Sequence, residues 1–265
     1  MPTVVTKPSN ASQVFIALVM LAAAVLAPAL LASRAPGLDW IIVLALMLAF
    51  LGTIGSWISS RVTGVLINER NLMSLSRFQL VLWTVLLLSA YWTAALRRIS
   101  SAGISDPLGI ALAPELWALM GISTVSLVGS PLLATGKKTK NPTDVDKAIA
   151  PAVEKFKEPK DEIKNNRVGT LYANASIADA AFTDLFEGEE IGNTASVDMA
   201  RVQMFFFTMI AAISYAVVLW RQFRTAPLEQ LNALPVLGDG LLAVLGISHA
   251  GYLMNKSVDH TQVQQ

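Results

Sequence analysis

Apolar residues gather in long runs along the chain, and polar segments separate these runs. Each run holds about 20 residues, the length that an α-helix needs to cross the hydrocarbon core of a bilayer. A helix of a soluble domain would instead carry its apolar residues on one face. The pattern therefore predicts an all-α, polytopic membrane protein. The six expected spans cover residues 13–32, 40–59, 76–96, 112–134, 201–220 and 236–254.

The first apolar run has two interpretations. It follows Lys7 and ends in Ala-rich sequence, as a cleaved signal peptide would. Its apolar stretch of about 19 residues is long for such a signal, so we expect a retained helix.

Composition supports the membrane class and narrows the chemistry. Hydrophobic residues make up 54% of the chain and charged residues 15%, whereas soluble domains carry about 25% charged residues. A net charge of +1 argues against a nucleic-acid partner. The absence of cysteine excludes disulfides and thiolate metal sites. We expect no cofactor and no metal.

The polar segment at 135–173 differs from the other connections. Eight lysines and six acidic residues crowd positions 137–164, with few large apolar residues between them. Such a composition buries too little surface to offset chain entropy, which predicts a solvated, partly helical linker. From residue 174, apolar residues at helical spacing predict a short amphipathic helix that leads to Glu187, Glu189 and Glu190. Solvated carboxylates are the favoured interpretation of this acidic stretch, and a cation site is the alternative.

Basic residues predict the orientation of the spans. With a cytoplasmic N-terminus, fifteen lysines and arginines fall on the cytoplasmic side and five on the opposite side. Positive residues favour the cytoplasmic side of a membrane protein, so both termini are expected there.

An internal repeat links the third and fifth predicted spans at an offset of 124 residues. The two spans are preceded at equivalent positions by Ser74 and Asp198. These are different residue types, but both are good helix N-caps. The matched residues are Arg77 and Arg201, Gln79 and Gln203, Thr84 and Thr208, Tyr91 and Tyr215, and Arg97 and Arg221.

The fourth and sixth spans match with one residue of slippage. Residues 121–123 and 246–248 both read Gly-Ile-Ser. The second half of the chain is therefore expected to hold a duplicated helical hairpin, and an even number of spans between the copies makes the repeat parallel. The expected organisation is an N-terminal hairpin at 1–60, a first repeat hairpin at 61–134, the linker at 135–173, and an amphipathic helix with the second hairpin at 174–265.

The matched polar residues have two interpretations. They could form a polar seam between the repeats, with His249 added from the last span, because an ionisable group inside a membrane is often functional. Alternatively, Thr and Tyr bond neighbouring helices, while Arg and Gln anchor the membrane boundary. The candidate seam comprises Arg77, Gln79, Thr84, Tyr91, Arg201, Gln203, Thr208, Tyr215 and His249. Helix packing is assigned to the small residues Gly121, Ser123, Gly246, Ser248 and Ala250.

Several stretches resemble a broad group of uncharacterised bacterial multipass membrane proteins. The resemblance rests on residues 74–79 (SLSRFQ), 184–193 (DLFEGEEIGN), 197–203 (VDMARVQ) and 245–253 (LGISHAGYL). It covers roughly the last two hundred residues and implies a bacterial inner-membrane setting, without an activity to carry over.

No catalytic motif stands out in the sequence, so we do not expect an enzyme. The favoured function is a scaffold or anchor of a membrane assembly, with the lipid bilayer, a second copy or another membrane-complex subunit as partner. The alternative is an ion channel or small-solute transporter.

Overall fold

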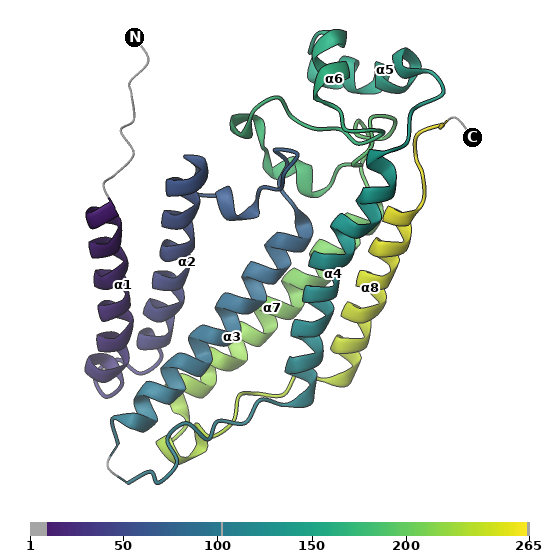
Figure 1. Ribbon diagram of the computed structural model, residues 1–265. Helices are drawn as coiled ribbons and strands as arrows, with labels where there is room; N and C mark the ends of the chain where they lie inside the picture. Colours follow the sequence, from purple (N-terminus) through teal and green to yellow (C-terminus); the bar gives the residue numbers. More distant parts are fainter. Residues whose placement is uncertain (1–9, 102, 264–265) are drawn as a thin grey trace. The chain divides into compact units, whose positions relative to one another are not determined.

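The computed structural model describes residues 10–101 and 103–263, and Lys7 lies outside the described part. Within these residues the chain is helical, with eight α-helices and isolated β-bridges in place of strands (Figure 1). The helices are α1 (Asn10–Leu31), α2 (Leu38–Ser59), α3 (Leu75–Ile99), α4 (Pro114–Lys138), α5 (Val145–Phe156), α6 (Lys160–Asn166), α7 (Met199–Thr225) and α8 (Asp239–Ser257).

Five of these helices, α1, α2, α3, α4 and α7, are long and apolar enough to cross a membrane. This finding supports a membrane-embedded helical protein. The sixth expected span is also helical, as α8, but does not pass the same hydropathy criterion over the described residues. Asp239, His249 and Lys256 lower its hydropathy.

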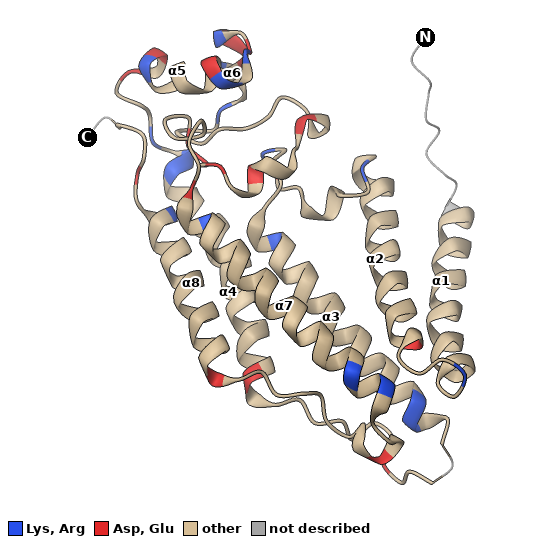
Figure 2. Ribbon diagram, turned by 180° about the vertical axis from the view of Figure 1, so that it is seen from behind, with Lys and Arg blue, Asp and Glu red and all other residues tan. Residues whose placement is uncertain are grey.

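The chain divides into two compact units. Of the described residues, those within 1–65, 82–116 and 212–237 form the first unit, and those within 66–81, 117–211 and 238–265 form the second. Helices α3 and α7 each contribute one part to each unit. Charged residues lie mainly at helix ends and in the connecting segments, whereas the middle parts of the five candidate spans are free of charge (Figure 2).

The prediction of a solvated linker at 135–173 is wrong for its apolar residues. Helices α5 and α6 bury Ile149, Ala152 and Ile163, which form one core cluster with Tyr172 and Ile191. Asp144 caps α5 by accepting a hydrogen bond from the Lys147 backbone N–H at 3.1 Å. A few apolar residues at helical spacing are enough to fold this charged segment against its neighbours.

The predicted amphipathic helix after residue 174 is also wrong. Two short 3₁₀ helices, Ile177–Asp179 and Phe182–Leu185, occupy this segment. The carboxylates of Asp179 and Asp184 accept hydrogen bonds from the backbone N–H groups of Ser176 and Ala181, each three residues earlier. Such local bonds favour turns over a continued α-helix. The apolar residues still pack into a core cluster that contains Ala180 and Leu185.

Candidate functional site: a buried ion-pair cluster

Two capped helix starts position the polar residues of the second unit. The backbone N–H of Ser74 donates to Leu66 O, and that of Asp198 donates to Phe186 O, both at 2.8 Å. The Ser74 hydroxyl then accepts from the Arg77 backbone N–H at 3.5 Å, and the Asp198 carboxylate accepts from the Arg201 backbone N–H at 3.3 Å. The predicted N-caps are confirmed, and each fixes the first turn of its helix.

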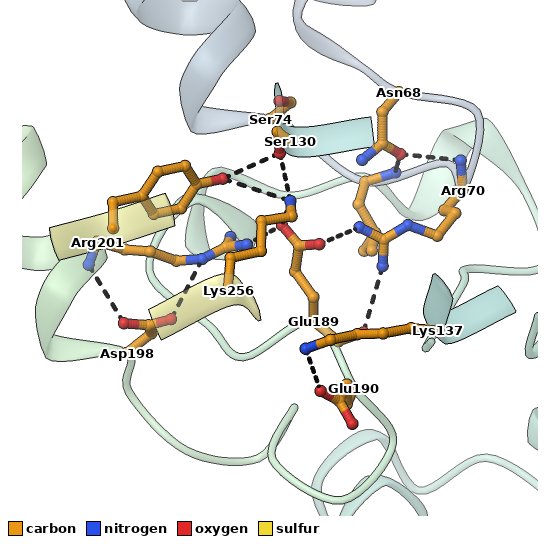
Figure 3. A network of polar contacts seen from close by, with 12 residues as sticks. Asn68, Arg70, Ser74, Ser130, Lys137, Glu189, Glu190, Asp198, Arg201 and Lys256 are labelled. Carbon is orange, nitrogen blue, oxygen red and sulfur yellow. Dashed lines mark hydrogen bonds and ion pairs between the residues drawn. The ribbon is translucent and has the colours of Figure 1, made fainter. Parts of the chain in front are cut away.

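Glu189 is the centre of the cluster that forms beside these helix starts (Figure 3). Its carboxylate lies 2.6 Å from the guanidinium of Arg70 and 2.6 Å from the ammonium of Lys256. It also pairs with Arg201 at the start of α7. Arg70 additionally donates to the carbonyl oxygen of Tyr172 at 3.0 Å. One carboxylate therefore joins three cations from distant parts of the sequence.

The cluster is buried, which makes its charges interdependent. The side chains of Arg70, Arg201 and Lys256 are 4%, 5% and 9% exposed, and that of Glu189 is 14% exposed. Burial alone would raise the pKa of Glu189, but the positive charges of Lys256, Arg201 and Arg70 together lower its pKa well below the usual value. Glu189 is therefore a carboxylate at neutral pH.

Asp198 and two hydroxyls bond the cations that pair with Glu189. Asp198 lies 3.5 Å from the Arg201 guanidinium and accepts from the Asn255 amide at 3.0 Å. The Lys256 ammonium also donates to the Ser130 hydroxyl on α4 and lies 3.4 Å from the Tyr252 hydroxyl. Three cations thus face two carboxylates here, which leaves one positive charge in excess.

Glu190 ties the C-terminal segment to the same end of α4. Its carboxylate pairs with Lys137 at 2.6 Å and accepts from the backbone N–H groups of His260 and Thr261 at 3.0 and 2.9 Å. Lys137 also donates to Val258 O at 2.5 Å. The Glu190 side chain is 1% exposed, so these bonds satisfy a fully buried charge.

Asp184 adds a second connection between the loops of this unit. Its carboxylate accepts from the Met73 backbone N–H at 2.9 Å and from that of Ala181 at 3.0 Å. Burial raises the pKa of Asp184, and these two hydrogen bonds counteract part of that effect.

The shape of the site excludes a large ligand. A cavity of about 20 Å³ lies among Lys137, Glu189, Arg201 and Lys256, which is room for about one water molecule. No group of three or more metal-ligating side chains occurs among the described residues. The arrangement therefore acts as an electrostatic junction between chain segments.

The predicted seam residues have different surroundings. The Gln79 amide donates to the Thr208 hydroxyl at 2.6 Å, and both side chains are fully buried. Gln203, the repeat partner of Gln79, is exposed. Arg77 and Thr84 are half-buried, whereas Arg201 is buried. Arg201 and Gln79 are thus both buried and bonded to partners within the second unit.

The repeat tyrosines lie in the first unit and have matching roles. The Tyr91 hydroxyl donates to Leu108 O at 3.4 Å, and the Tyr215 hydroxyl donates to Pro235 O at 3.0 Å. Each tyrosine thereby holds the loop that follows its own helix.

His249 is buried in α8 and is only partly satisfied. Its Nδ1 lies 2.8 Å from Leu245 O, one turn earlier. Its Nε2 and the hydroxyls of Ser123, Ser126 and Ser248 are enclosed without a hydrogen-bond partner among the described residues. Buried polar atoms without partners are uncommon and are candidates for ordered water or for function.

The small residues assigned to packing also differ from one another. A Cβ added at Gly246 would lie 3.8 Å from the Ile122 side chain, so Gly246 faces α4. A Cβ added at Gly121 would meet open space. Ser123 and Ser248 are buried, but Ala250 is exposed.

A second buried ion pair lies in the first unit, and the sequence patterns did not predict it. Arg97 binds Asp39 through two bonds of 2.6 Å and donates to Phe223 O at 2.8 Å. The Phe223 ring stacks on Trp40 at a centroid distance of 5.8 Å, and the Trp40 indole donates to the Ser89 hydroxyl at 3.1 Å. This bidentate pair is a strong and directional contact.

Comparisons with known proteins add no function. The chain matches no protein-family model, no curated protein and no solved structure.

Proposed function

We propose that this protein is a non-enzymatic membrane scaffold that holds a folded polar platform at the helix ends of its second unit and docks another subunit there. The observation that carries the proposal is the junction of Glu189 and Glu190. These two adjacent residues bind four cations, Arg70, Lys137, Arg201 and Lys256, which come from a loop and from the ends of α4, α7 and α8.

The junction supports a platform because it joins segments that lie far apart in the sequence. It bonds the loop before α3 and residues 258–263 to the helix ends, and an apolar cluster that includes Ile149, Ile163 and Tyr172 packs α5 and α6 together. A flexible tether would need none of these buried bonds. A fixed arrangement presents the same surface to a partner without an ordering cost on binding.

The proposed topology has six spans and a parallel repeat of a hairpin. Helix α8 has 19 residues, which span about 28 Å and so suit a bilayer core of about 30 Å. The repeat is supported by equivalent bonds in the two copies: the caps Ser74 and Asp198, and the loop-holding tyrosines Tyr91 and Tyr215.

The proposed setting is a bacterial inner membrane with both termini cytoplasmic. Fifteen of the twenty lysines and arginines are cytoplasmic under this orientation, and five lie on the opposite side of the membrane. The platform would then face the cytoplasm and meet a soluble or membrane-bound subunit, and the protein itself would form an oligomer.

The second candidate function is a channel or small-solute transporter. The observation that favours it is the set of enclosed polar atoms on α4 and α8, namely His249 Nε2 and three serine hydroxyls without partners among the described residues. Hydration of these groups in another conformation would open a polar path between the helices.

The test is the mass of the intact particle, isolated from native membranes in a gentle detergent. Wild-type protein, Glu189→Gln and Glu229→Gln are compared, because Glu229 is an exposed glutamate in a 3₁₀ turn of the first unit. We expect a partner at fixed stoichiometry with the wild type and Glu229→Gln, and loss of that partner with Glu189→Gln. Circular dichroism reports whether each variant keeps its helices.

A strictly monomeric wild-type particle without a partner would overturn the scaffold. A homo-oligomer without a partner whose reconstitution in liposomes gives an ion or solute flux would support the channel, provided that His249→Ala changes this flux.

A further inference from the structure

An apolar groove lies in the first unit, between α1, α2 and α3. Its volume is about 500 Å³, and apart from Thr84 its lining consists of aliphatic, methionine and aromatic side chains. All three helices that line it are candidate membrane spans. The groove is therefore an apolar hollow in a part of the protein that is built to contact hydrocarbon.

A hydrogen bond between two helices lies at one end of the groove. The Trp92 indole N–H on α3 donates to Ala24 O on α1 at 3.2 Å. Because this bond uses the indole donor, Trp92 offers the groove only the apolar surface of its ring. An occupant needs no polar group at this end.

The length of the groove matches one leaflet of a bilayer. Along α1 it extends from Val14 to Ala24, and ten residues of α-helix rise about 15 Å. The hydrocarbon core of a bilayer is about 30 Å thick, so each leaflet contributes about 15 Å.

The groove is open along its side to the surface of the helices. Leu18, Leu21 and Leu88 contribute to its lining and are still 58%, 55% and 48% exposed. Spanning helices expose such surface to lipid chains, so hydrocarbon and not water borders this opening. An empty hollow of this size would forgo the dispersion contacts of all its lining atoms.

We propose that the groove binds one acyl chain of a phospholipid, from the leaflet on the side where α1 begins. A transmembrane helix of a second copy is the competing occupant, and the measurements below distinguish the two. This inference requires only the membrane location and is independent of the partner proposed above.

The test is native mass spectrometry of the protein released from nanodiscs that contain phosphatidylethanolamine and phosphatidylglycerol. Ala17→Phe places a ring in the groove, and Ala22→Phe adds the same ring to an exposed position on α1 outside the lining. We expect one phospholipid to stay bound to the wild type and to Ala22→Phe. Its occupancy in Ala17→Phe should fall on the order of tenfold or more, which corresponds to a loss of at least about 1.4 kcal/mol.

A second measurement needs no variant within α1. Phospholipids with brominated acyl chains should quench the fluorescence of the wild type more than that of Trp92→Phe, because Trp92 lines the groove. Equal retention of lipid in all three proteins, or equal quenching with and without Trp92, would overturn the proposal. A wild-type dimer that Ala17→Phe dissociates, or a bound species with a mass other than that of a phospholipid, would overturn it in favour of a different occupant.

Discussion

The two units of the protein bury charge in opposite ways. The first unit closes a single pair, in which Arg97 and Asp39 match one cation with one carboxylate through two hydrogen bonds. The second unit shares Glu189 among Arg70, Arg201 and Lys256, so one carboxylate pairs with all three cations. A closed pair depends on two residues, whereas a shared carboxylate makes several chain segments depend on one residue.

The difference has a thermodynamic consequence. A buried pair as a whole contributes little net stability, because the Coulomb attraction offsets the desolvation of both ions. Loss of one partner is costly because the other ion stays buried and unpaired. The cost should therefore increase with the number of ions left without a partner.

The largest effect is expected for Glu189→Gln, which keeps the size of the side chain and removes its charge. Three buried cations would then face Asp198 alone, and we expect the free energy of unfolding to fall by about 5 kcal/mol, the upper end for a broken buried pair. Thermal unfolding in detergent measures the change, with Glu229→Gln as the control at an exposed glutamate. Equal unfolding temperatures for the two variants would contradict the shared role of Glu189.

Acid should remove the same stabilisation in the wild type. The pKa of Glu189 is lowered on folding because Lys256, Arg201 and Arg70 together outweigh the raising effect of burial. The stabilisation is therefore present above the unfolded pKa of about 4.3 and is lost as the pH falls through the folded value. Unfolding measured from pH 7 to pH 3 should show a decrease below about pH 4.3 that is smaller in Glu189→Gln. An identical pH profile for both proteins would contradict this assignment.

In the first unit the effect should be smaller and reversible by a second change. Asp39→Asn leaves one cation unpaired, and Arg97 keeps its bond to Phe223 O, so we expect a loss of about 3 kcal/mol. Replacement of both residues, Asp39→Leu with Arg97→Met, should recover most of this loss because apolar side chains can substitute for a closed pair.

The corresponding double change in the second unit, Glu189→Leu with Arg70→Met, should not recover stability, because Arg201 and Lys256 stay buried. Thermal unfolding of the four proteins measures this difference. Recovery in both units, or in neither, would break the distinction between a closed pair and a shared carboxylate.

The sequence predicted the helical membrane class, because runs of about 20 apolar residues are what a bilayer core requires and a soluble core does not. It did not predict that three cations share Glu189. The repeat singled out Arg201 because it matches Arg77. Glu189 and Lys256 match no residue of the first copy, so the repeat did not single them out. Ion pairs between residues 119 and 67 positions apart leave no local pattern in the sequence.

The two errors at 135–186 have local causes. The mean hydropathy of the charged segment is low because its lysines outnumber Ile149, Ala152 and Ile163. The spacing of these three residues nevertheless places them on helix faces that can be buried. Asp179 and Asp184 interrupt a helical pattern by bonding the backbone N–H groups three residues before them. Side-chain turn chemistry overrides the apolar period there.

The smallest effect tests the repeat within the second unit. Gln79 is buried and donates to Thr208, whereas Gln203, at the equivalent position of the second copy, is exposed. Gln79→Leu removes one neutral hydrogen bond and leaves the Thr208 hydroxyl enclosed, so we expect a loss of about 1 to 2 kcal/mol in unfolding free energy. Gln203→Leu should change it by less than about 0.5 kcal/mol, as surface substitutions do. Similar losses for both variants would mean that the two repeat copies use this glutamine alike. The two copies would then not differ here in the way that the closed pair of the first unit differs from the shared carboxylate of the second.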